Sequence, residues 1–357
     1  MGFNHPQFPW LELIDRPAFC IKDGCVLAAN SAAEKHYIQV GMHVNEIITE
    51  NREAYEFFQN GTLFLTITAG DLPYRASVTR TEEYDIFSIE QTEEDAQLQA
   101  FSLAAQQLRI PLSNLMTVID NLLLSLNSKA AETQIQIGQI NRNLFRILRI
   151  ISNMSDANNY RKKISGDKQI LNFKSFFSEI IERVQTTTDY TQKKLVYTGL
   201  KSAVFGLGDR EKLSRAIYNI LSNALKFSPA DSIVEAKLTQ SDNLLHFSVL
   251  NTNSEPVDDY SFWNQFSRKP SIEDDRFGLG LGMTLISSII CAHGGTILVD
   301  HPAENVTRVT ATIAIERGNE SVVRSPVFQI GDYAGGRDKG LLELSEVLPS
   351  EIYKDIN

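Results

Sequence analysis

The chain has 357 residues, of which 43% are apolar and 22% are charged, and its formal net charge is -10. This length is enough for two or three domains, and the composition is ordinary for globular protein. An acidic chain lacks the basic footprint of nucleic-acid binders, so we expect no nucleic-acid partner. Its three cysteines show no CxxC spacing, which argues against a zinc site or a disulfide framework and suits a reducing compartment.

Targeting signals are not evident in the sequence. No stretch reaches about 18 uninterrupted apolar residues, so we expect no membrane span. The first residues lack the basic and apolar regions of a signal peptide. Pro6 stands where an N-myristoylation motif needs Ser or Thr. These features predict a cytoplasmic protein.

Residues 1–90 alternate short apolar runs with turns. Asp23-Gly24 between two β-type runs predicts a hairpin, and Asn30 is placed to cap a helix. Strands are expected at 63–68, 74–81 and 84–89. A hairpin, an Asn-capped helix and a strand meander together resemble a PAS sensor domain. A small α+β domain without a ligand is the alternative.

Residues 92–160 contain one glycine, Gly138, and one proline, Pro111. Apolar residues recur at helical spacing in two runs separated by a turn at 127–129. The first run is Leu108, Leu112, Leu115, Ile119, Leu122 and Leu126, and the second is Ile137, Ile140, Leu144, Ile147, Leu148 and Ile151. Two amphipathic helices form a hairpin whose wide apolar face needs covering, so we expect a dimeric four-helix bundle.

Residues 168–316 read as a mixed α/β domain. Helices are expected at 173–184, 213–227 and 282–293, with a strand that ends in a turn at 204–209 and strands near 233–238, 244–250 and 306–315. Asn219, Asn223 and Lys226 follow one another at i, i+4 and i+7, which places them on one helical face. A carboxamide oxygen there can bind a hard cation, and a lysine one turn later can meet a phosphate. A solvated polar face is the alternative.

A glycine-rich loop precedes the last predicted helix of this domain. Gly278, Gly280 and Gly282 let the backbone approach a phosphate at a helix N-terminus. Ala292-His293-Gly294-Gly295 follows this loop, and we assign His293 a structural role. Arg268, Lys269 and Arg276 lie in the segment upstream. They either reach phosphates or remain solvated.

Together these motifs resemble the sensor histidine kinase family over residues 92–316. The run 219–227 resembles the N box and 278–283 the G2 box, while 262–266 resembles the F box. The resemblance implies a multidomain α+β protein with a Bergerat-type α/β sandwich that binds ATP and Mg²⁺. It makes Asn223 the Mg²⁺ ligand, places Asn219 beside the γ-phosphate and gives Lys226 a phosphate contact.

The adenine-binding box departs from the family pattern. Asn251 replaces the aspartate that accepts the adenine amino group, although its carboxamide retains an acceptor oxygen. Both glycines of the box are replaced as well, and Glu255 brings a negative charge. The sequence therefore predicts weakened adenine recognition.

The phosphoacceptor box departs further. The family carries His-Glu-Leu-Arg-Thr-Pro-Leu, and the matching run is Gln106-Gln107-Leu108-Arg109-Ile110-Pro111-Leu112. An amide nitrogen has a delocalised lone pair, so Gln106 cannot be the phosphoryl acceptor. Gln107 cannot act as a base, and Ile110 cannot position water for a phosphatase reaction. The chain has no histidine between His43 and His246 to replace Gln106.

Residues 317–357 are expected to form a linker and one short helix that docks on a partner, or else a disordered tail.

Three functions fit these observations. The first is an ATP-binding dimer that cannot autophosphorylate in cis and regulates a two-component pathway, as a homodimer or paired with an active histidine kinase, with a response regulator as a further partner. The second is an enzyme that phosphorylates a partner histidine in trans or hydrolyses ATP. The third is a nucleotide-free dimeric scaffold.

Overall fold

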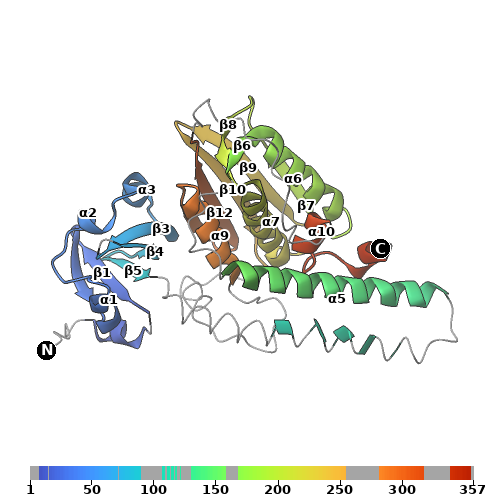
Figure 1. The fold of residues 1–357 in the computed structure, drawn as a ribbon, viewed down its shortest axis with the longest axis horizontal. Helices are drawn as coiled ribbons and strands as arrows, with labels where there is room; N and C mark the ends of the chain where they lie inside the picture. Colours follow the sequence, from blue (N-terminus) through green and yellow to red (C-terminus); the bar gives the residue numbers. More distant parts are fainter. Residues whose placement is uncertain are drawn as a thin grey trace.

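The computed structural model of the chain describes residues 8–14, 16–70, 72–89, 130–157, 168–254, 281–316 and 338–354, with scattered positions between 107 and 121. Its helices and strands belong to an N-terminal α/β domain, a long helix, a second α/β domain and a short C-terminal segment (Figure 1). No described helix is long and apolar enough to cross a membrane.

The N-terminal domain contains the predicted hairpin, capped helix and strand meander. Its elements are η1 (Pro9–Leu13), β1 (Ala18–Lys22), β2 (Cys25–Ala29), α1 (Ser31–Lys35), α2 (Val44–Ile47), α3 (Arg52–Phe57), β3 (Thr62–Ala69), β4 (Leu72–Arg80) and β5 (Asp85–Ile89). Asn30 caps α1, since its Oδ1 accepts from the backbone of Ala33 at 2.9 Å. The same oxygen accepts from Ala18 at 3.0 Å, so one buried carboxamide ties the helix start to β1.

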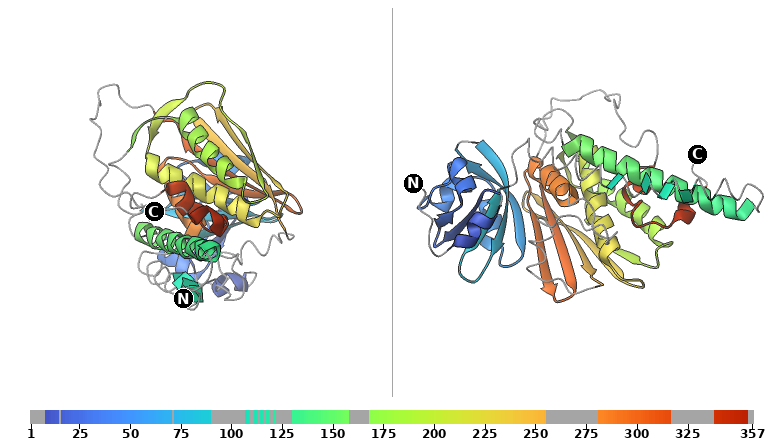
Figure 2. Two further views of the ribbon diagram at one scale, coloured as in Figure 1. Left: turned by 90° about the vertical axis from the view of Figure 1, so that its right-hand side faces the viewer. Right: turned by 90° about the horizontal axis from the view of Figure 1, so that it is seen from below.

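The long helix α5 (Ala130–Ala157) is the second helix predicted for the hairpin. Its two faces differ in exposure. Phe145 and Arg149 are buried, whereas Ile137 and Leu144 are 39% and 44% exposed. Part of the predicted apolar stripe is therefore exposed, and a neighbouring face docks on the second α/β domain (Figure 2).

The second α/β domain has three helices on one face of its sheet (Figures 1 and 2). Its elements are β6 (Gln169–Asn172), α6 (Phe173–Thr188), β7 (Lys194–Thr198), β8 (Phe205–Gly208), α7 (Arg210–Phe227), β9 (Ile233–Ser241), β10 (Leu244–Thr252), α9 (Leu281–Ala292), β11 (Ile297–Ala303) and β12 (Val306–Ala314). Burial alternates along β9 and β10, as expected for a sheet with one covered face. Strands β6, β7 and β11 were not anticipated from the sequence.

The two α/β domains share one sheet. The strand order is β2-β1-β5-β4-β3-β11-β12-β10-β9-β7, with β7 and β9 parallel and the other pairs antiparallel. Leu63 pairs with Leu298 where β3 meets β11. Beside this junction Gly61 adopts φ +86°, and a Cβ there would lie 2.2 Å from the carbonyl oxygen of Val299. Glycine is thus needed for both the conformation and the close approach.

The C-terminal segment 338–353 contains α10 (Lys339–Glu343) and η2 (Ser350–Tyr353). It packs against α5, α6 and α7 of the same chain. A short helix was expected here, but its docking surface is the chain's own helices, whereas the sequence suggested a partner. Burial of Leu342, Leu344, Leu348 and Tyr353 drives this packing.

Replacement of Gly61 by alanine should loosen the junction between the two domains. The added Cβ meets backbone, so we expect a cost of about 2 kcal/mol and faster hydrogen exchange at residues 62–64 and 297–299. Gly41→Ala is the matched control, because Gly41 also has a positive φ (+90°) but no atom lies within 4 Å of the place its Cβ would take. Equal effects of the two substitutions on exchange at 297–299 would contradict the junction's dependence on Gly61.

Candidate nucleotide-binding site

Helix α7 carries the predicted phosphate-facing residues. Asp209 caps it, since the carboxylate accepts from the backbone of Lys212 at 3.0 Å. The helix ends at Ser228, directly before Pro229. One face enters the core through residues including Leu213 and Ile217. The helical spacing then turns the polar residues toward α5 and the start of α9.

The three polar residues of this face have different surroundings. Asn219 is 1% exposed, and its Oδ1 accepts from Nη2 of Arg149 on α5 at 2.9 Å. Asn223 is half-buried, and its Nδ2 lies 4.0 Å from the place that a Cβ on Gly282, at the start of α9, would take. The fold therefore brings the N-box-like and glycine-rich segments together. Gly278 and Gly280 lie outside the described residues, as do 262–277.

Asn251 is the penultimate residue of β10, beside the C-terminal end of α7. It is buried, and its Nδ2 donates to Oδ1 of Asn253 at 3.0 Å and to the carbonyl of Thr252 at 3.4 Å. The backbone of Ser254 donates to the carbonyl of Phe227, which ties this stretch to α7. The carboxamide is thus oriented through its amino group, which leaves recognition by Asn251 to its carbonyl oxygen. Glu255 lies outside the described residues.

Two carboxylates of the C-terminal segment occupy the polar face of α7. The fully buried Glu343 accepts through Oε2 from Nε of Arg149 at 3.2 Å and from Nδ2 of Asn219 at 3.3 Å. Its Oε1 lies 3.4 Å from Nε of Arg215. Glu346 accepts from Nζ of Lys226 at 2.8 Å. The face that the sequence assigned to phosphate therefore binds anions in this structure.

The charge of Glu346 is fixed by its neighbours. Burial alone would raise the pKa of this carboxyl, but the positive charges of Arg149, Lys226 and Arg146 outweigh it and lower the pKa to about 2. Arg149 contributes through Nη1, which lies 3.4 Å from Oε1 of Glu346. Glu346 is accordingly an anion across the physiological pH range.

Arg149, Glu343 and Glu346 are site residues that the sequence did not identify. The two glutamates stand three positions apart in an otherwise apolar stretch, Leu341-Leu342-Glu343-Leu344-Ser345-Glu346-Val347. This pattern was visible, but their cationic partners lie more than 100 residues away in sequence.

His293 sits in the turn after α9 and is buried. Its Nε2 accepts from the backbone of Asp209 at 3.0 Å, and Nδ1 is 2.7 Å from the carbonyl of Ile289. Burial lowers the pKa of His293 and outweighs the opposing hydrogen bond to Ile289. A neutral imidazole that bridges the α7 cap to α9 is consistent with a structural role.

The phosphoacceptor-like box is described only in part. Gln107 is half-buried and helical, and Pro111 is buried and helical. Gln106 and Ile110 lie outside the described residues.

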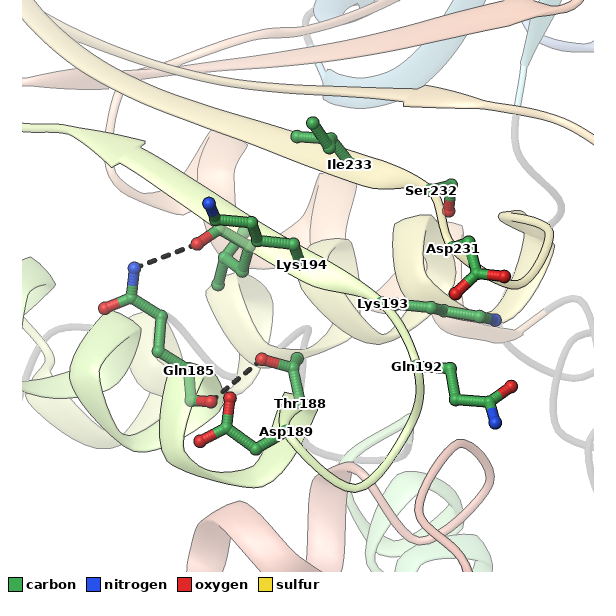
Figure 3. Close-up of a pocket in the computed structure, with 10 residues that line it drawn as sticks. Gln185, Thr188, Asp189, Gln192, Lys193, Lys194, Asp231, Ser232 and Ile233 are labelled. Atoms are coloured by element: carbon green, nitrogen blue, oxygen red, sulfur yellow. Dashed lines mark hydrogen bonds between the residues drawn. The ribbon is translucent and has the colours of Figure 1, made fainter.

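A surface hollow of about 780 Å³ opens beside the edge strand β7 (Figure 3). Lys193, Lys194, Asp189 and Asp231 are among its lining residues, and none of the predicted nucleotide-site residues lines it. Gln185 also lines the hollow and donates to the carbonyl of Leu195 at 2.9 Å. Mixed charges at an open edge give this hollow no preference for an anionic ligand.

Residues 208–317 match the family model of the histidine kinase-, DNA gyrase B- and HSP90-like ATPases. This segment is an ATPase domain of that family. The chain is also homologous to sensor histidine kinases. It is 26% identical over 215 residues to the sensor histidine kinase CusS of Escherichia coli K12, covering 58% of this chain and 44% of CusS. It is 30% identical over 162 residues to the heme sensor protein HssS of Staphylococcus aureus strain Newman, covering 45% and 34%.

The chain thus spans less than half the length of these relatives. Among solved structures, histidine kinase ThkA in complex with response regulator protein TrrA aligns with 85% of this chain and 96% of that chain, at a TM-score of 0.46 and 14% identity. The expected ATPase fold and the multidomain α+β class are confirmed by the family match together with the observed elements.

Protonation of His293 should destabilise the folded ATPase domain. In the unfolded chain this imidazole takes up a proton as the pH falls through 6.5, whereas the buried ring resists protonation. The free energy of unfolding should therefore fall as the pH drops below 6.5, and His293→Gln should show a shallower dependence between pH 7 and 5. Chemical denaturation at each pH measures this.

Glu346 does not obscure that comparison. Its stabilising contribution is complete above pH 4.5 and is lost as the pH falls from 4.5 toward 2, so it titrates below the window of His293. An identical pH dependence for the wild type and His293→Gln would show that another group controls the slope.

Proposed function

We propose that the protein is an ATP-binding regulator of a two-component pathway that does not autophosphorylate in cis. The observation that carries this proposal is the polar face of α7, which bears Asn219, Asn223 and Lys226 and brings Asn223 beside Gly282 within an ATPase domain. Gln106, which stands where the family has its phosphoacceptor histidine, supports the absence of autophosphorylation in cis.

The residues present fit a nucleotide with its metal ion. Lys226 and Arg149 already hold two carboxylates, so the surface can neutralise a comparable anionic charge on phosphates. Asn223 is half-buried and offers the side-chain oxygen that Mg²⁺ prefers. Gly278, Gly280 and Gly282 would admit the phosphates to the N-terminus of α9, and Asn251 would accept from the adenine amino group. Bound Mg²⁺ would offset the charge of the phosphates.

We propose that residues 1–90 form a PAS-like sensor domain. The hairpin, the Asn30-capped helix and the meander of β3, β4 and β5 support this assignment. Their sheet continues into the ATPase domain through β11, which offers a route by which the sensor could bias the site.

We propose that residues 92–160 dimerise, either as a homodimer or with an active histidine kinase. The exposed apolar residues Ile137 and Leu144, which lie two turns apart on one face of α5, support this role, because their burial in a four-helix bundle would stabilise a dimer. A response regulator is the expected downstream partner. Cys20 and Cys25 are free thiols, in line with a reducing, cytoplasmic location.

Two other functions have specific support. A nucleotide-free scaffold is favoured by Asn251 and by Glu346, which neutralises Lys226 without any nucleotide. Phosphorylation of a partner in trans, or ATP hydrolysis, is favoured by Asn223 beside Gly282, because a site kept for phosphate binding can serve catalysis. Measurable affinity for nucleotide would exclude the nucleotide-free scaffold. Transfer of label to a co-purified partner would support phosphorylation in trans.

Asn223→Ala should remove Mg²⁺-dependent nucleotide binding. Because Asn223 is half-buried and outside the Asn219–Arg149–Glu343 network, the fold should survive, while the affinity for a non-hydrolysable ATP analogue drops about tenfold or more in the presence of Mg²⁺. Calorimetric titration with and without Mg²⁺ measures this. Asn243→Ala, in an exposed hairpin turn, is the control, and equal Mg²⁺ dependence in both variants would reject Asn223 as the ligand.

The purified protein should form no phosphohistidine when incubated with ATP and Mg²⁺. Gln106 offers no nucleophilic nitrogen, so no acid-labile label should appear on the wild-type chain. A Gln106→His, Gln107→Glu variant restores the family's residues, and labelling of it would show that the assay is competent. Acid-labile label on the wild type would overturn the proposed loss of autophosphorylation.

A further inference from the structure

The C-terminal segment 338–353 packs against α5, α6 and α7 (Figures 1 and 2). Its apolar side chains merge with the core of the ATPase domain. Tyr353 is fully buried, packs edge-on against Phe145 of α5 at 5.2 Å between ring centroids, and donates to the carbonyl of Leu341 at 2.8 Å. This docking is thus specific and not a loose association of a tail.

Polar side chains of α5 also bind the backbone of the segment. Asn141 of α5 donates to the carbonyl of Tyr353 at 2.9 Å, and Arg142 donates to the carbonyls of Ser345 and Glu346 at 3.2 and 3.3 Å. Asp338 at the start of the segment forms an ion pair with Arg183 of α6. Polar contacts therefore extend along the whole segment and fix its register.

Gly138 permits the closest approach between α5 and the segment. A Cβ at this position would lie 2.4 Å from the carbonyl oxygen of Ser350, which is closer than any real contact. Glycine within a helix costs stability relative to alanine. Its presence at the contact with η2 shows that α5 is shaped to receive this segment.

Glu343 and Glu346 bring their carboxylates to the side chains that the proposed function assigns to phosphate. Glu343 contacts Asn219, and Glu346 contacts Lys226, while Arg149 of α5 reaches both carboxylates. Lys226 is only 11% exposed in this arrangement. A phosphate that contacts Lys226 at this position therefore competes with the Glu346 carboxylate for the same ammonium group.

We propose that α5 and α7 together form a binding site for an acidic peptide, that segment 338–353 is its occupant, and that this segment competes with nucleotide phosphates for Asn219 and Lys226. The proposal rests on the nucleotide-binding function proposed above. Nucleotide and segment bind the same side chains. The apparent affinity for nucleotide therefore falls in proportion to the fraction of molecules in which the segment is undocked. Because the segment also bridges α5 to α7, its displacement removes these bridging contacts and leaves α5 held by α9 and by the hydrogen bond from Arg149 to Asn219.

The test compares the affinity for a non-hydrolysable ATP analogue with Mg²⁺ in full-length variants. Glu346→Gln removes the charge that holds Lys226, and Gly138→Ala displaces η2 while favouring the α5 helix itself. Both should bind the analogue about tenfold more tightly than the wild type. Glu351→Gln is the control, since it removes the same charge from the same segment at an exposed position and should leave the affinity unchanged.

Hydrogen exchange supplies a second readout on the unmodified protein. The amides of Leu342, Leu344 and Leu348 bond within the docked segment and should exchange faster when the analogue is added. Faster exchange together with tighter binding by Glu346→Gln and Gly138→Ala would support competition.

Two outcomes would overturn the competition and are distinguishable. If every protein binds the analogue with equal affinity and exchange at the segment is unchanged, the segment does not compete, while nucleotide binding stands. If neither the wild type nor the variants bind the analogue, the proposed nucleotide-binding function fails and the competition fails with it.

Discussion

The buried carboxylate of Glu343 is the interaction on which the arrangement of the C-terminal half depends. It is fully buried and lies between Arg149 of α5 and Arg215 of α7, with Asn219 completing its contacts. Removing one partner of such a buried group leaves an uncompensated charge, which typically costs about 3–5 kcal/mol. Three segments that are distant in sequence are therefore held in one arrangement by a single side chain. The docked C-terminal segment therefore reinforces the contact of α5 with the ATPase domain, which Arg149 also makes directly through Asn219.

The same network bears on the replacement of the phosphoacceptor histidine by Gln106. Gln106 removes the chemistry that would require the helical region to deliver a histidine to the nucleotide. Without that requirement, a contact that holds α5 against α7 has no catalytic cost. In the proposed competition, the polar face of α7 would report whether nucleotide or the acidic segment is bound, and such a response would suit a regulator.

Local patterns in the sequence were sufficient for much of the fold. The meander of β3, β4 and β5, the Asn30 cap and the helices α6, α7 and α9 were all predicted close to their observed positions, because each is encoded by a cap, a turn or a periodic run. β7 and β11 were missed. β7 is a short edge strand, and β11 contains Pro302 and follows a glycine pair, so neither has a clear strand signal. The placement of Asn219, Asn223 and Lys226 on one helix was predictable from their spacing alone. Arg149, Glu343 and Glu346 were not, since their hydrogen bonds join residues that are 70, 194 and 120 positions apart in the sequence.

The shared sheet has a consequence for solubility. An unpaired strand offers its free N–H and C=O groups to any other extended chain, and proteins generally conceal such edges. Pairing of β3 with β11 conceals two of them at once, leaving β2 and β7 as the ends of the ten-stranded sheet in the described part of the chain. An isolated N-terminal domain would expose the edge of β3, and an isolated second domain would expose the edge of β11. Each domain thus acts as a cap that keeps the other from aggregating.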